Sequence, residues 1–250
     1  MTDKYAVLGS PIQHSLSPKI HNLVFSRLSS SASYESFEVQ DNLAQFLADK
    51  PDHAGFSLTM PLKDQAFEIA TSLSPLAAST KSVNTLLRTK DGYKGFNTDV
   101  FGIQKAVNQN PQEVAVLGSG ATARSALTAF GDSKKVVYAR NQELAAELAE
   151  EFDATVVSLT EALHKELVIS TFPKGVLPEL VANSEPLQTV LDVAYTNPRI
   201  PAKRYISGLE MLIHQAIYQQ RIFHFGGEET ALRNEPELIE ELFELLLVAK

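Results

Sequence analysis

The sequence predicts an α/β protein whose second half is a Rossmann-type dinucleotide-binding domain. Residues 114–117 are four apolar residues rich in Val, a pattern that favours a buried parallel strand. A Gly-Ser-Gly turn at 118–120 and an Ala-rich segment at 121–130 follow. A strand, a glycine turn and a helix in this order direct backbone N–H groups and a helix N-terminus at a phosphate. A second strand-like run at 135–139 favours a nucleotide site over the alternative, a βα turn without a ligand.

The residue that ends this second strand indicates which dinucleotide is bound. NAD enzymes place Asp or Glu about 20 residues beyond the glycines, where the carboxylate accepts hydrogen bonds from the ribose 2′-hydroxyl. Here the strand ends in Arg140, and the first acidic residue, Glu143, falls inside the next helix. A carboxylate would repel a 2′-phosphate, whereas a guanidinium binds it through two charged hydrogen bonds. The pattern predicts NADP; the alternative is an arginine that only caps a surface turn.

The composition excludes several kinds of site and partner. The chain has 250 residues, enough for two domains, and no cysteine, which excludes disulfides, iron–sulfur clusters and thiol catalysis. Its net charge of −8 and its scattered Lys and Arg argue against a nucleic-acid partner. The six histidines show no ligand spacing on a predicted helix, so we expect no metal. The first strand begins by about Tyr5 and no apolar run is long enough for a membrane span, so we expect a cytoplasmic protein. We also expect it to be a monomer or homodimer.

Strands and helices alternate in the first hundred residues. We expect strands at 5–8, 34–39, 54–58, 83–87 and 93–97, and helices at 17–27, 43–48 and 100–107. Ser17-Pro18 is typical of an N-cap followed by proline at the first helical position, and Pro61 is expected at the start of a further helix. The last two strands are joined across Asp91-Gly92, a hairpin signal.

Two features of this half are candidates for function. Lys63 falls in the first turn of a predicted helix, where the positive end of the helix dipole disfavours a cation. A residue that breaks a local rule is a functional candidate, although a solvated surface lysine is the alternative. Small hydrogen-bonding residues also stand at two strand ends, Asn84-Thr85 and 97–99. Helix capping explains each of them singly but not why both strand ends carry them.

The second half continues with the same alternation. We expect strands at 155–157, 167–170 and 189–192, and helices at 142–152, near 161–164, from Gly208 onward and at 236–247. The loop at 171–175 follows a parallel strand, and such loops are where ligands bind. In the helix after Gly208, Gln215 is flanked by an apolar face. The last helix is amphipathic and acidic, and we expect it to pack on the first domain.

Seven motifs follow one another along the chain. In order they are Gly9-Ser10-Pro11-Ile12-x-His14-Ser15-x-Ser17-Pro18-x-x-His21-Asn22, Ser57-Leu58-Thr59-Met60-Pro61-x-Lys63, Asn84-Thr85, Gly95-x-Asn97-Thr98-Asp99, Gly118-Ser119-Gly120, Asp192-x-x-Tyr195 and Gly208-x-x-Met211-Leu212-x-x-Gln215-Ala216. In these motifs the chain resembles the shikimate dehydrogenase family over its whole length. That family reduces 3-dehydroshikimate to shikimate with NADPH in aromatic biosynthesis, and the resemblance implies this activity here.

The resemblance also implies two domains with a cleft between them. An N-terminal α/β substrate-binding domain would span 1–100, completed by C-terminal helices at 211–250, and a Rossmann-like NADP-binding domain would span 101–210. Lys63 and Asp99 would be the catalytic pair, and we expect them to titrate as a coupled pair. The lysine would stabilise negative charge on the substrate oxygen and supply a proton, and the sequence leaves open whether it does both.

The resemblance assigns the remaining site residues to the two ligands. The substrate would be held by Ser15, Ser17, Thr59, Lys63, Asn84, Asp99, Tyr195 and Gln215. NADP would be held by Gly118, Ser119, Gly120, Ala121, Thr122, Ala123, Arg140, Asn141, Thr171, Phe172, Pro173, Ala194, Gly208 and Met211. Three departures from the family's usual pattern fall on the cofactor side: Ala121 replaces a third glycine, Ala139-Arg140-Asn141 replaces Asn-Arg-Thr or Asn-Arg-Ser, and residues 170–173 replace Asn-Ala-Thr-Pro.

Three functions remain open at this point. The first is the biosynthetic reductase, which the motifs favour. The second is a relative that uses quinate or shikimate with NAD, and Arg140 argues against it. The third is a nucleotide-binding regulator that has kept the fold and lost turnover, and the presence of Lys63 and Asp99 argues against that.

Overall fold

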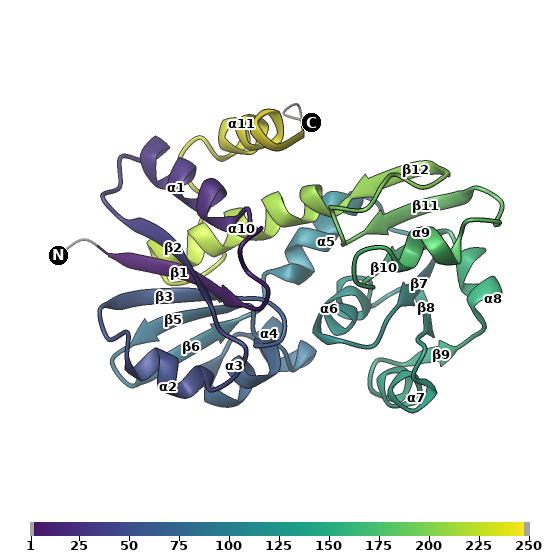
Figure 1. Ribbon diagram of the computed structural model, residues 1–250, viewed down its shortest axis with the longest axis horizontal. Coiled ribbons are helices and arrows are strands. Elements are labelled where there is room, and N and C mark those ends of the chain that lie inside the picture. The colour runs from purple at the N-terminus through teal and green to yellow at the C-terminus, as the bar shows by residue number, and fades with distance from the viewer. Residues whose placement is uncertain (1–2, 248–250) are drawn as a thin grey trace. The chain divides into compact units, whose positions relative to one another are not determined.

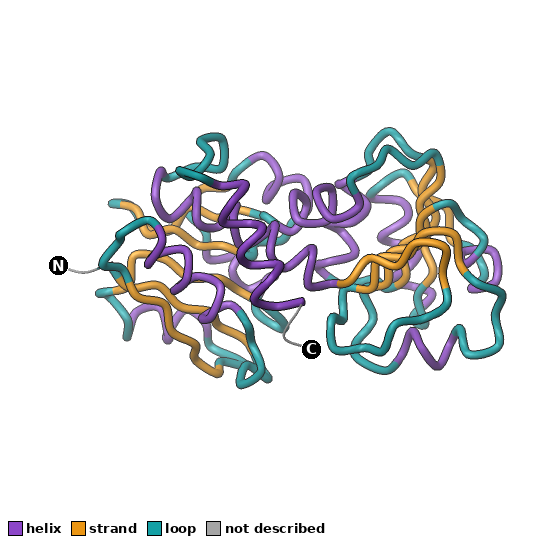
Figure 2. The backbone as a smooth tube through the Cα atoms, turned by 90° about the horizontal axis from the view of Figure 1, so that it is seen from above, coloured by secondary structure: helices purple, strands orange, loops and turns teal. Residues whose placement is uncertain are grey.

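The strands form two separate six-stranded sheets, which can be followed in the two views of the backbone (Figures 1 and 2). The structure is a computed structural model, and it describes residues 3–247. The chain divides into two compact units, the first made of Met1–Thr98 with Ile213–Lys250 and the second made of Asp99–Leu212. Among the described residues, no helix has both the length and the apolar character that a membrane span requires. The predicted α/β class is confirmed.

The first unit is built on a mixed sheet with the strand order β2-β1-β3-β5-β6-β4. Its strands are β1 (Lys4–Gly9), β2 (Ser33–Glu38), β3 (His53–Leu58), β4 (Ser72–Leu73), β5 (Thr85–Thr89) and β6 (Gly92–Phe96). Its helices are α1 (Ser17–Arg27), α2 (Leu43–Ala48), α3 (Lys63–Ile69), α4 (Pro75–Thr80), α11 (Glu235–Leu247) and the part of α10 (Gly208–Phe225) from Ile213 onward. β5 is antiparallel to both of its neighbours, and the other pairings are parallel.

Both faces of the sheet are buried at β1, as the alternating side chains of this strand show. Tyr5 and Val7 belong to a core cluster with Phe25 of α1 and Phe223 of α10. Ala6 and Leu8 belong to a different cluster, formed with residues of α2, α3 and α4. Figure 1 shows α1 and α10 over one face of the sheet and α2 and α3 over the other. Because side chains of a strand alternate between faces, a strand covered on both sides must be apolar throughout, which is why β1 reads as a continuous apolar run.

The second unit has a fully parallel sheet with the strand order β12-β11-β10-β7-β8-β9. Its strands are β7 (Glu113–Leu117), β8 (Lys134–Tyr138), β9 (Ala154–Val156), β10 (Leu167–Ser170), β11 (Leu187–Asp192) and β12 (Ala202–Ser207). Its helices are α5 (Asp99–Val107), α6 (Ala121–Ala129), α7 (Gln142–Glu151), α8 (Leu159–Leu163), α9 (Val176–Leu180) and the first part of α10. After β9 the chain crosses to the other side of β7, so the strand order reverses between β7 and β10. Ligands of open parallel sheets bind at such a switch point.

The bounds expected for the first helix are confirmed, but its expected N-cap is wrong, and so is the expected start of α3. Ser17 does not cap α1, because Leu16 already has helical dihedrals and Ser17 is itself the first helical residue. Instead, Ser15 Oγ accepts a hydrogen bond from the Ser17 N–H at 3.3 Å. Pro61 does not begin α3, which starts at Lys63 after the cap residue Leu62. Proline is compatible with a helix start but equally with the preceding loop, so its presence alone does not place the boundary.

Four elements of the structure lie outside the ranges that the sequence predicts. α4 begins with Ser74 as N-cap and Pro75, the same signal that marks α1 in the sequence, and Ser74 Oγ accepts from the Ala77 N–H. α9 has only five residues and β4 only two, too few for a periodic pattern. β12 is an edge strand with an exposed Lys203, and edge strands of this kind lack the apolar run of a buried parallel strand. The last helix, α11, contacts α1 as expected.

Candidate functional site

Several strand ends meet at one edge of the first sheet, and predicted substrate residues lie there. β1, β3 and β6 point the same way and β5 the opposite way, so the carboxyl ends of the first three share an edge with the amino end of β5. Thr59 follows β3, Asn84 precedes β5, and Thr98 lies beyond β6. The Thr98 N–H donates to Asn84 Oδ1 at 2.9 Å. This contact explains why both strand ends carry small hydrogen-bonding residues.

The polar side chains at this edge form a buried cluster. Asn84 Nδ2 donates to Thr98 Oγ1 at 2.9 Å and to Gln215 Oε1 at 3.3 Å. Thr98 Oγ1 lies 3.2 Å from Gln215 Oε1, to which it donates. All three residues are buried. Neutral amides and hydroxyls both donate and accept, so such a cluster suits a ligand that carries hydroxyl groups.

Lys63 is attached to this edge through its backbone. Its C=O accepts from the Val83 N–H at 3.2 Å, and the Leu58 N–H donates to the C=O of Asn84 at 2.8 Å. The start of α3 is therefore bonded to the residue that precedes Asn84. The Lys63 side chain is half-buried, and its position in the first turn of a helix is confirmed.

The loop that carries Thr59 packs closely on the end of β1. The Thr59 N–H donates to the C=O of Leu8 at 2.9 Å, and a Cβ added at Gly9 would lie 2.3 Å from Thr59 Cγ2. Only glycine leaves room for Thr59 at this place. Ser15 and Ser17 belong to the segment that follows β1, with Ser17 buried and Ser15 half-buried.

Two of the predicted substrate residues belong to the second unit. Asp99 is the first residue of α5 and is buried, and it directly follows Thr98 of the first unit. Tyr195 lies beyond β11 and is half-buried, and burial raises the pKa of its hydroxyl. The roles of both residues stay predictions.

In the second unit the glycine turn lies at the switch point of the sheet. Gly118 directly follows β7 and has φ +124°, and a Cβ added there would lie 2.2 Å from Thr171 Oγ1. Thr171 follows β10, and its N–H and Oγ1 both donate to the C=O of Leu117, at 2.9 and 3.0 Å. Gly118 is therefore required for its backbone conformation and for the close approach of Thr171. Two predicted cofactor segments, 118–123 and 171–173, are neighbours.

The space beside Gly120 fits a phosphate. A Cβ added at Gly120 would meet no atom within 4 Å, and this glycine precedes the first turn of α6, residues 121–123. The N–H groups of a first helical turn and the helix dipole favour an anion. Arg140 is exposed and follows β8, the strand next to β7. An open cradle and an exposed guanidinium on adjacent strands fit a dinucleotide that carries a 2′-phosphate.

Some predicted cofactor residues have structural contacts of their own. Asn141 Oδ1 accepts from the N–H groups of Glu143 and Leu144 and so caps α7. Phe172 packs edge-on against Tyr138 in the core under α8 and α9. Any contact of Phe172 with a cofactor would therefore use its backbone. Met211 is also buried, whereas Pro173 is exposed.

The loop after β11 is organised by the buried carboxylate of Asp192. It accepts from the Ala194 N–H at 3.2 Å and from Asn197 Nδ2 at 2.8 Å. Burial raises the pKa of Asp192, and the Asn197 hydrogen bond opposes this. A Cβ added at Gly208 would lie 2.2 Å from the C=O of Val193, so α10 can begin against this loop only with glycine.

His21 is fully buried, and sequence reasoning assigned it no role. Its ring stacks on Tyr34 with 4.1 Å between the ring centroids. Its Nε2 lies 3.2 Å from Gln219 Oε1 and its Nδ1 lies 2.7 Å from Gln220 Nε2. Burial lowers the pKa of His21 to about 3, partly opposed by the Gln219 hydrogen bond. The sequence gives no clear signal for this contact, because α10 also carries Glu210, His214, Gln215 and Arg221 among its apolar residues.

We expect the free energy of unfolding to fall as the pH falls below 6.5. An unfolded chain protonates His21 near pH 6.5 and the native chain only near 3, so in this window the unfolded state binds the extra proton. Through His21 alone, the free energy of unfolding should fall by about 1.4 kcal/mol for each pH unit in this window. Urea unfolding at several pH values should show a shallower slope for His21→Asn than for the wild type, and an unchanged slope for exposed His14→Asn. Equal slopes for the wild type and His21→Asn would contradict this expectation.

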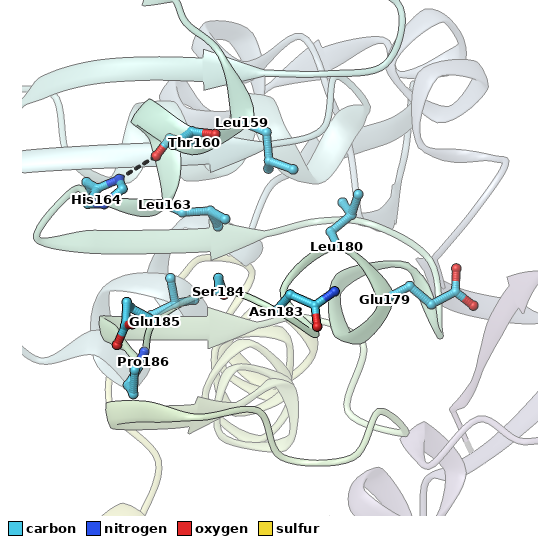
Figure 3. A pocket seen from close by; sticks show the side chains of 11 residues that line it. Leu159, Thr160, Leu163, His164, Glu179, Leu180, Asn183, Ser184, Glu185 and Pro186 are labelled. Atoms are coloured by element: carbon cyan, nitrogen blue, oxygen red, sulfur yellow. Dashed lines mark hydrogen bonds between the residues drawn. The ribbon is translucent and has the colours of Figure 1, made fainter.

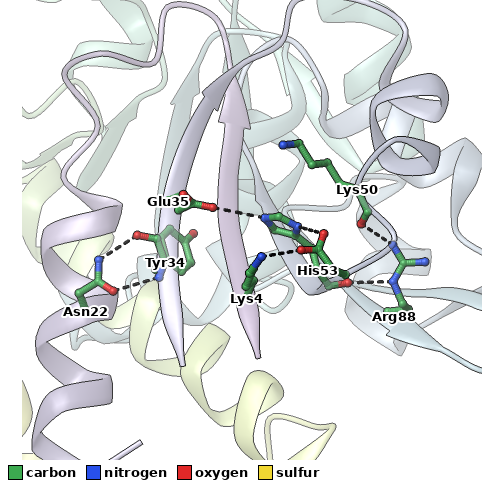
Figure 4. A network of polar contacts seen from close by, with 8 residues as sticks. Lys4, Asn22, Tyr34, Glu35, Lys50, His53 and Arg88 are labelled. Atoms are coloured by element: carbon green, nitrogen blue, oxygen red, sulfur yellow. Dashed lines mark hydrogen bonds and ion pairs between the residues drawn. The ribbon is translucent and has the colours of Figure 1, made fainter. Parts of the chain in front are cut away.

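A second polar cluster lies where β1 and β3 begin, at the opposite edge of the first sheet (Figure 4). Buried His53 lies between Asp52 and Glu35, at 3.1 and 3.6 Å, and Lys4 Nζ donates to Asp52 at 2.6 Å. The Lys4 and His53 contacts lower the pKa of Asp52 to about 2. Arg88 of β5 donates to the C=O of His53 at 2.8 Å. These contacts join four strands, and we assign them to stability.

A pocket of about 390 Å³ in the second unit is a weaker candidate (Figure 3). It lies between α8, α9 and the start of β11, whereas ligands of parallel sheets bind beyond the carboxyl ends of the strands. Leucines form much of its lining, and His164 Nδ1 lies 2.6 Å from the C=O of Thr160. The residues around it are Leu159, Thr160, Leu163, His164, Glu179, Leu180, Asn183, Ser184, Glu185, Pro186 and Leu187.

Two family models match the chain, one in each unit. Residues 7–86 match the shikimate dehydrogenase substrate binding domain. Residues 113–197 match the family described as NADP oxidoreductase, coenzyme F420-dependent. The first match contains the edge with Thr59, Lys63 and Asn84, and the second contains the glycine turn and Arg140.

Curated proteins and solved structures extend the similarity over nearly the whole chain. The shikimate dehydrogenase (NADP(+)) of Oleidesulfovibrio alaskensis is 32% identical over 252 residues, which cover 88% of each chain. The pentafunctional AROM polypeptide of Candida tropicalis is 31% identical over 89% of this chain, which spans only 17% of that polypeptide. The structure of a shikimate 5-dehydrogenase from Thermus thermophilus, in complex with NADP(H) and shikimate, matches with a TM-score of 0.80 and 27% identity, covering 96% of this chain and 98% of that one.

Proposed function

The chain belongs to the shikimate dehydrogenase family, and we propose that it catalyses the reversible, NADPH-dependent reduction of 3-dehydroshikimate to shikimate. The observation that carries this proposal is the buried cluster of Asn84, Thr98 and Gln215. Asn84 and Gln215 are 131 residues apart in the sequence and meet through a hydrogen bond. Their amides can donate to and accept from the hydroxyl groups of a sugar-like ring.

The first unit would hold the substrate. Ser15, Ser17, Thr59, Lys63, Asn84 and Gln215 belong to it, and the second unit would contribute Asp99 and Tyr195. Serine hydroxyls suit the substrate carboxylate, because neutral donors bind it and leave the few charged groups for the reaction.

Lys63 is the residue to which we assign the main chemical role. NADPH, when bound, supplies the hydride. The Lys63 ammonium would stabilise the negative charge that develops on the ketone oxygen and would donate the proton to that oxygen. Asp99 is the second member of the proposed catalytic pair, and its negative charge would attract the lysine ammonium.

The second unit would bind NADP at the switch point of its sheet. We propose that the backbone of 118–123 faces the pyrophosphate and that Arg140 binds the 2′-phosphate, with Asn141 beside it. Residues 171–173, Ala194, Gly208 and Met211 would contribute to the rest of the site. The open space beside Gly120 and the exposure of Arg140 support this assignment.

The two glycines of the turn should respond differently to replacement by alanine. Gly118→Ala should lower the free energy of unfolding by about 1–3 kcal/mol, because φ is positive and the new Cβ meets Thr171. Gly120→Ala should change stability by less than about 1 kcal/mol, because its Cβ meets no protein atom. It should nevertheless weaken NADP binding, since the methyl group fills the space assigned to the phosphate. Urea unfolding and NADP titration of both variants measure this, and unchanged NADP affinity in Gly120→Ala would contradict the assignment.

Initial rates of the purified chain test the proposed function. Shikimate and quinate are each offered with NADP and with NAD, and the formation of reduced nicotinamide is followed. We expect turnover of shikimate with NADP, at a kcat/KM well above that of the other combinations. Preferred use of quinate with NAD would favour the alternative within the family. NADP binding without any turnover would favour a regulator.

The oligomeric state belongs to the same proposal. We expect a cytoplasmic monomer or homodimer whose partner is the small-molecule substrate, with no nucleic acid bound. Light scattering on the protein as it elutes from a size-exclusion column measures its mass in solution. A mass above that of a dimer would contradict this expectation.

A further inference from the structure

A buried glutamine of α10 is bonded to four groups on three different segments of the first unit. Gln219 lies one helical turn beyond Gln215 and is 2% exposed. Its Nε2 donates to the C=O of Asn84 at 3.1 Å and to Thr85 Oγ1 at 2.9 Å. Its Oε1 accepts from Ser57 Oγ at 2.9 Å and lies 3.2 Å from His21 Nε2.

The orientation of this amide follows from its partners. A backbone carbonyl only accepts, so the atom that faces the C=O of Asn84 must be the donor, Nε2. Oε1 then accepts two hydrogen bonds, and His21 Nε2 must carry the ring proton. His21 Nδ1 is left as the acceptor for Gln220 Nε2, at 2.7 Å. A neutral glutamine can satisfy all four groups at once, whereas an ionised carboxylate cannot donate to any of them.

Thr85 links Gln219 to Asn84, one of the predicted substrate residues, by hydrogen bonds. Thr85 Oγ1 accepts from Gln219 and therefore directs its own proton to Asn84 Oδ1, at 2.8 Å. With its Oδ1 held by Thr85 and by the Thr98 N–H, Asn84 presents Nδ2 to Thr98 and Gln215. The Thr98 N–H sets which end of the Asn84 amide is Oδ1, and the Thr85 hydroxyl, oriented by Gln219, adds a second hydrogen bond that holds the amide in place.

Gln219 Oε1 is held in turn by a hydrogen-bonded pair, Tyr34 and Ser57. The Tyr34 hydroxyl donates to Ser57 Oγ at 2.5 Å, and Ser57 donates to Gln219. Tyr34 also stacks on His21. All these groups are buried, so a change at Gln219 cannot be repaired by solvent without cost.

We propose that Gln219 is a positioning residue for the substrate, which helps to hold the Asn84 amide through Thr85 and so maintains the donor and acceptor pattern offered to the substrate hydroxyls. This inference rests on the proposed function of Asn84 and Gln215. Gln219 does not belong to the predicted set of substrate contacts, and it acts only through the residues that it holds.

Replacing Gln219 by methionine tests the inference, because the substitution should change the KM for shikimate and leave kcat nearly unchanged. Methionine has a similar length and volume but neither donor nor acceptor. The KM for shikimate should rise about 10-fold or more, while the KM for NADP should stay within twofold. kcat should stay within threefold, because a less firmly held Asn84 weakens binding of the ground state and the transition state alike. Titration of shikimate into the protein, measured by calorimetry, should show the same loss without any turnover.

Gln220→Met is the matched control. Gln220 is the adjacent residue of the same helix and is equally buried, but its contacts are with His21 and not with Asn84 or Thr85. Both variants should unfold at a lower temperature, whereas only Gln219→Met should lose shikimate affinity. An equal rise of the shikimate KM in both variants, or a rise below twofold in folded Gln219→Met, would overturn the inference.

Gln219→Glu adds a readout that a merely structural residue would not move. A protonated carboxyl can still donate one hydrogen bond, and an ionised one cannot, so its shikimate KM relative to the wild type should rise as the pH increases. Burial should raise the pKa of the carboxyl introduced at position 219 above the usual range. The pH window from 6 to 9 lies about two to five units above the pKa of an unperturbed glutamate. If the ratio of the variant KM to the wild-type KM does not change with pH in this window, the result counts against the proposal.

Thr85→Val keeps the test decisive if the Gln219 variants do not fold. It removes the hydroxyl that links Gln219 to Asn84 and leaves Gln219 in place. It should raise the shikimate KM by a similar factor, and an unchanged KM would overturn the inference. Wild-type protein that neither binds nor oxidises shikimate would instead reject the proposed function, and the inference with it. Normal wild-type activity with unaffected variants rejects the inference alone.

Discussion

Replacing Lys63 by alanine is expected to lower kcat for shikimate oxidation by about 10²–10⁴-fold, the usual contribution of a general acid–base residue. The KM for shikimate should move little, because the proposed interaction of the ammonium is strongest when charge develops on the substrate oxygen. Steady-state rates at saturating NADP measure both constants. A large rise in KM with kcat preserved would show instead that the lysine only anchors the substrate.

The matched control is Lys90→Ala. Lys90 is exposed and lies in the turn between β5 and β6, at the end of these strands away from Asn84. It removes the same charge from the same unit, so its kcat should equal that of the wild type. Thermal unfolding of both variants checks that they are folded. A kcat of Lys63→Ala within threefold of the wild type would remove Lys63 from the mechanism.

Lys63→Arg separates the two chemical roles of the lysine. Arginine keeps the positive charge but does not release a proton at accessible pH. If Lys63 acts by charge alone, this variant should recover much of the kcat lost in Lys63→Ala. If Lys63 delivers the proton, the arginine variant should remain close to the alanine variant.

Replacing Arg140 by alanine is expected to raise the KM for NADP by about 10- to 150-fold, which corresponds to about 1.5–3 kcal/mol for one charged bidentate contact. The KM for NAD should change little, because NAD has no 2′-phosphate for the guanidinium to bind. Initial rates with each dinucleotide at saturating shikimate measure the two constants. The preference of the wild type for NADP should therefore be largely lost in the variant.

Arg233→Ala serves as the control for charge. Arg233 is exposed and belongs to the first unit, so its loss changes the net charge equally without affecting the proposed NADP site. Both KM values should stay at the wild-type level. Equal use of NADP and NAD by the wild-type protein would contradict the assignment of Arg140 before any variant is made.

The sequence by itself determined the features that depend on neighbouring residues. The apolar run of β7, the glycine turn and the Ala-rich start of α6 lie within eleven consecutive residues, so local propensity and spacing were enough to predict a phosphate loop. The same holds for Lys63 in the first helical turn and for Arg140 at the end of a strand. Elements with few residues or an exposed edge, such as β4 and β12, lack such a pattern and were missed.

Only the tertiary structure decided which distant residues meet. The crossing of the chain after β9 brings Thr171 against Gly118, and the reversed direction of β5 brings Asn84 to Thr98. The orientation of the Gln219 amide is fixed by four hydrogen-bond partners on segments far apart in the sequence. A buried amide is specified by the donors and acceptors around it, and strand order and helix packing supply these. No local pattern encodes them, because hydrogen-bond partners across a sheet edge are fixed by topology and not by spacing along the chain.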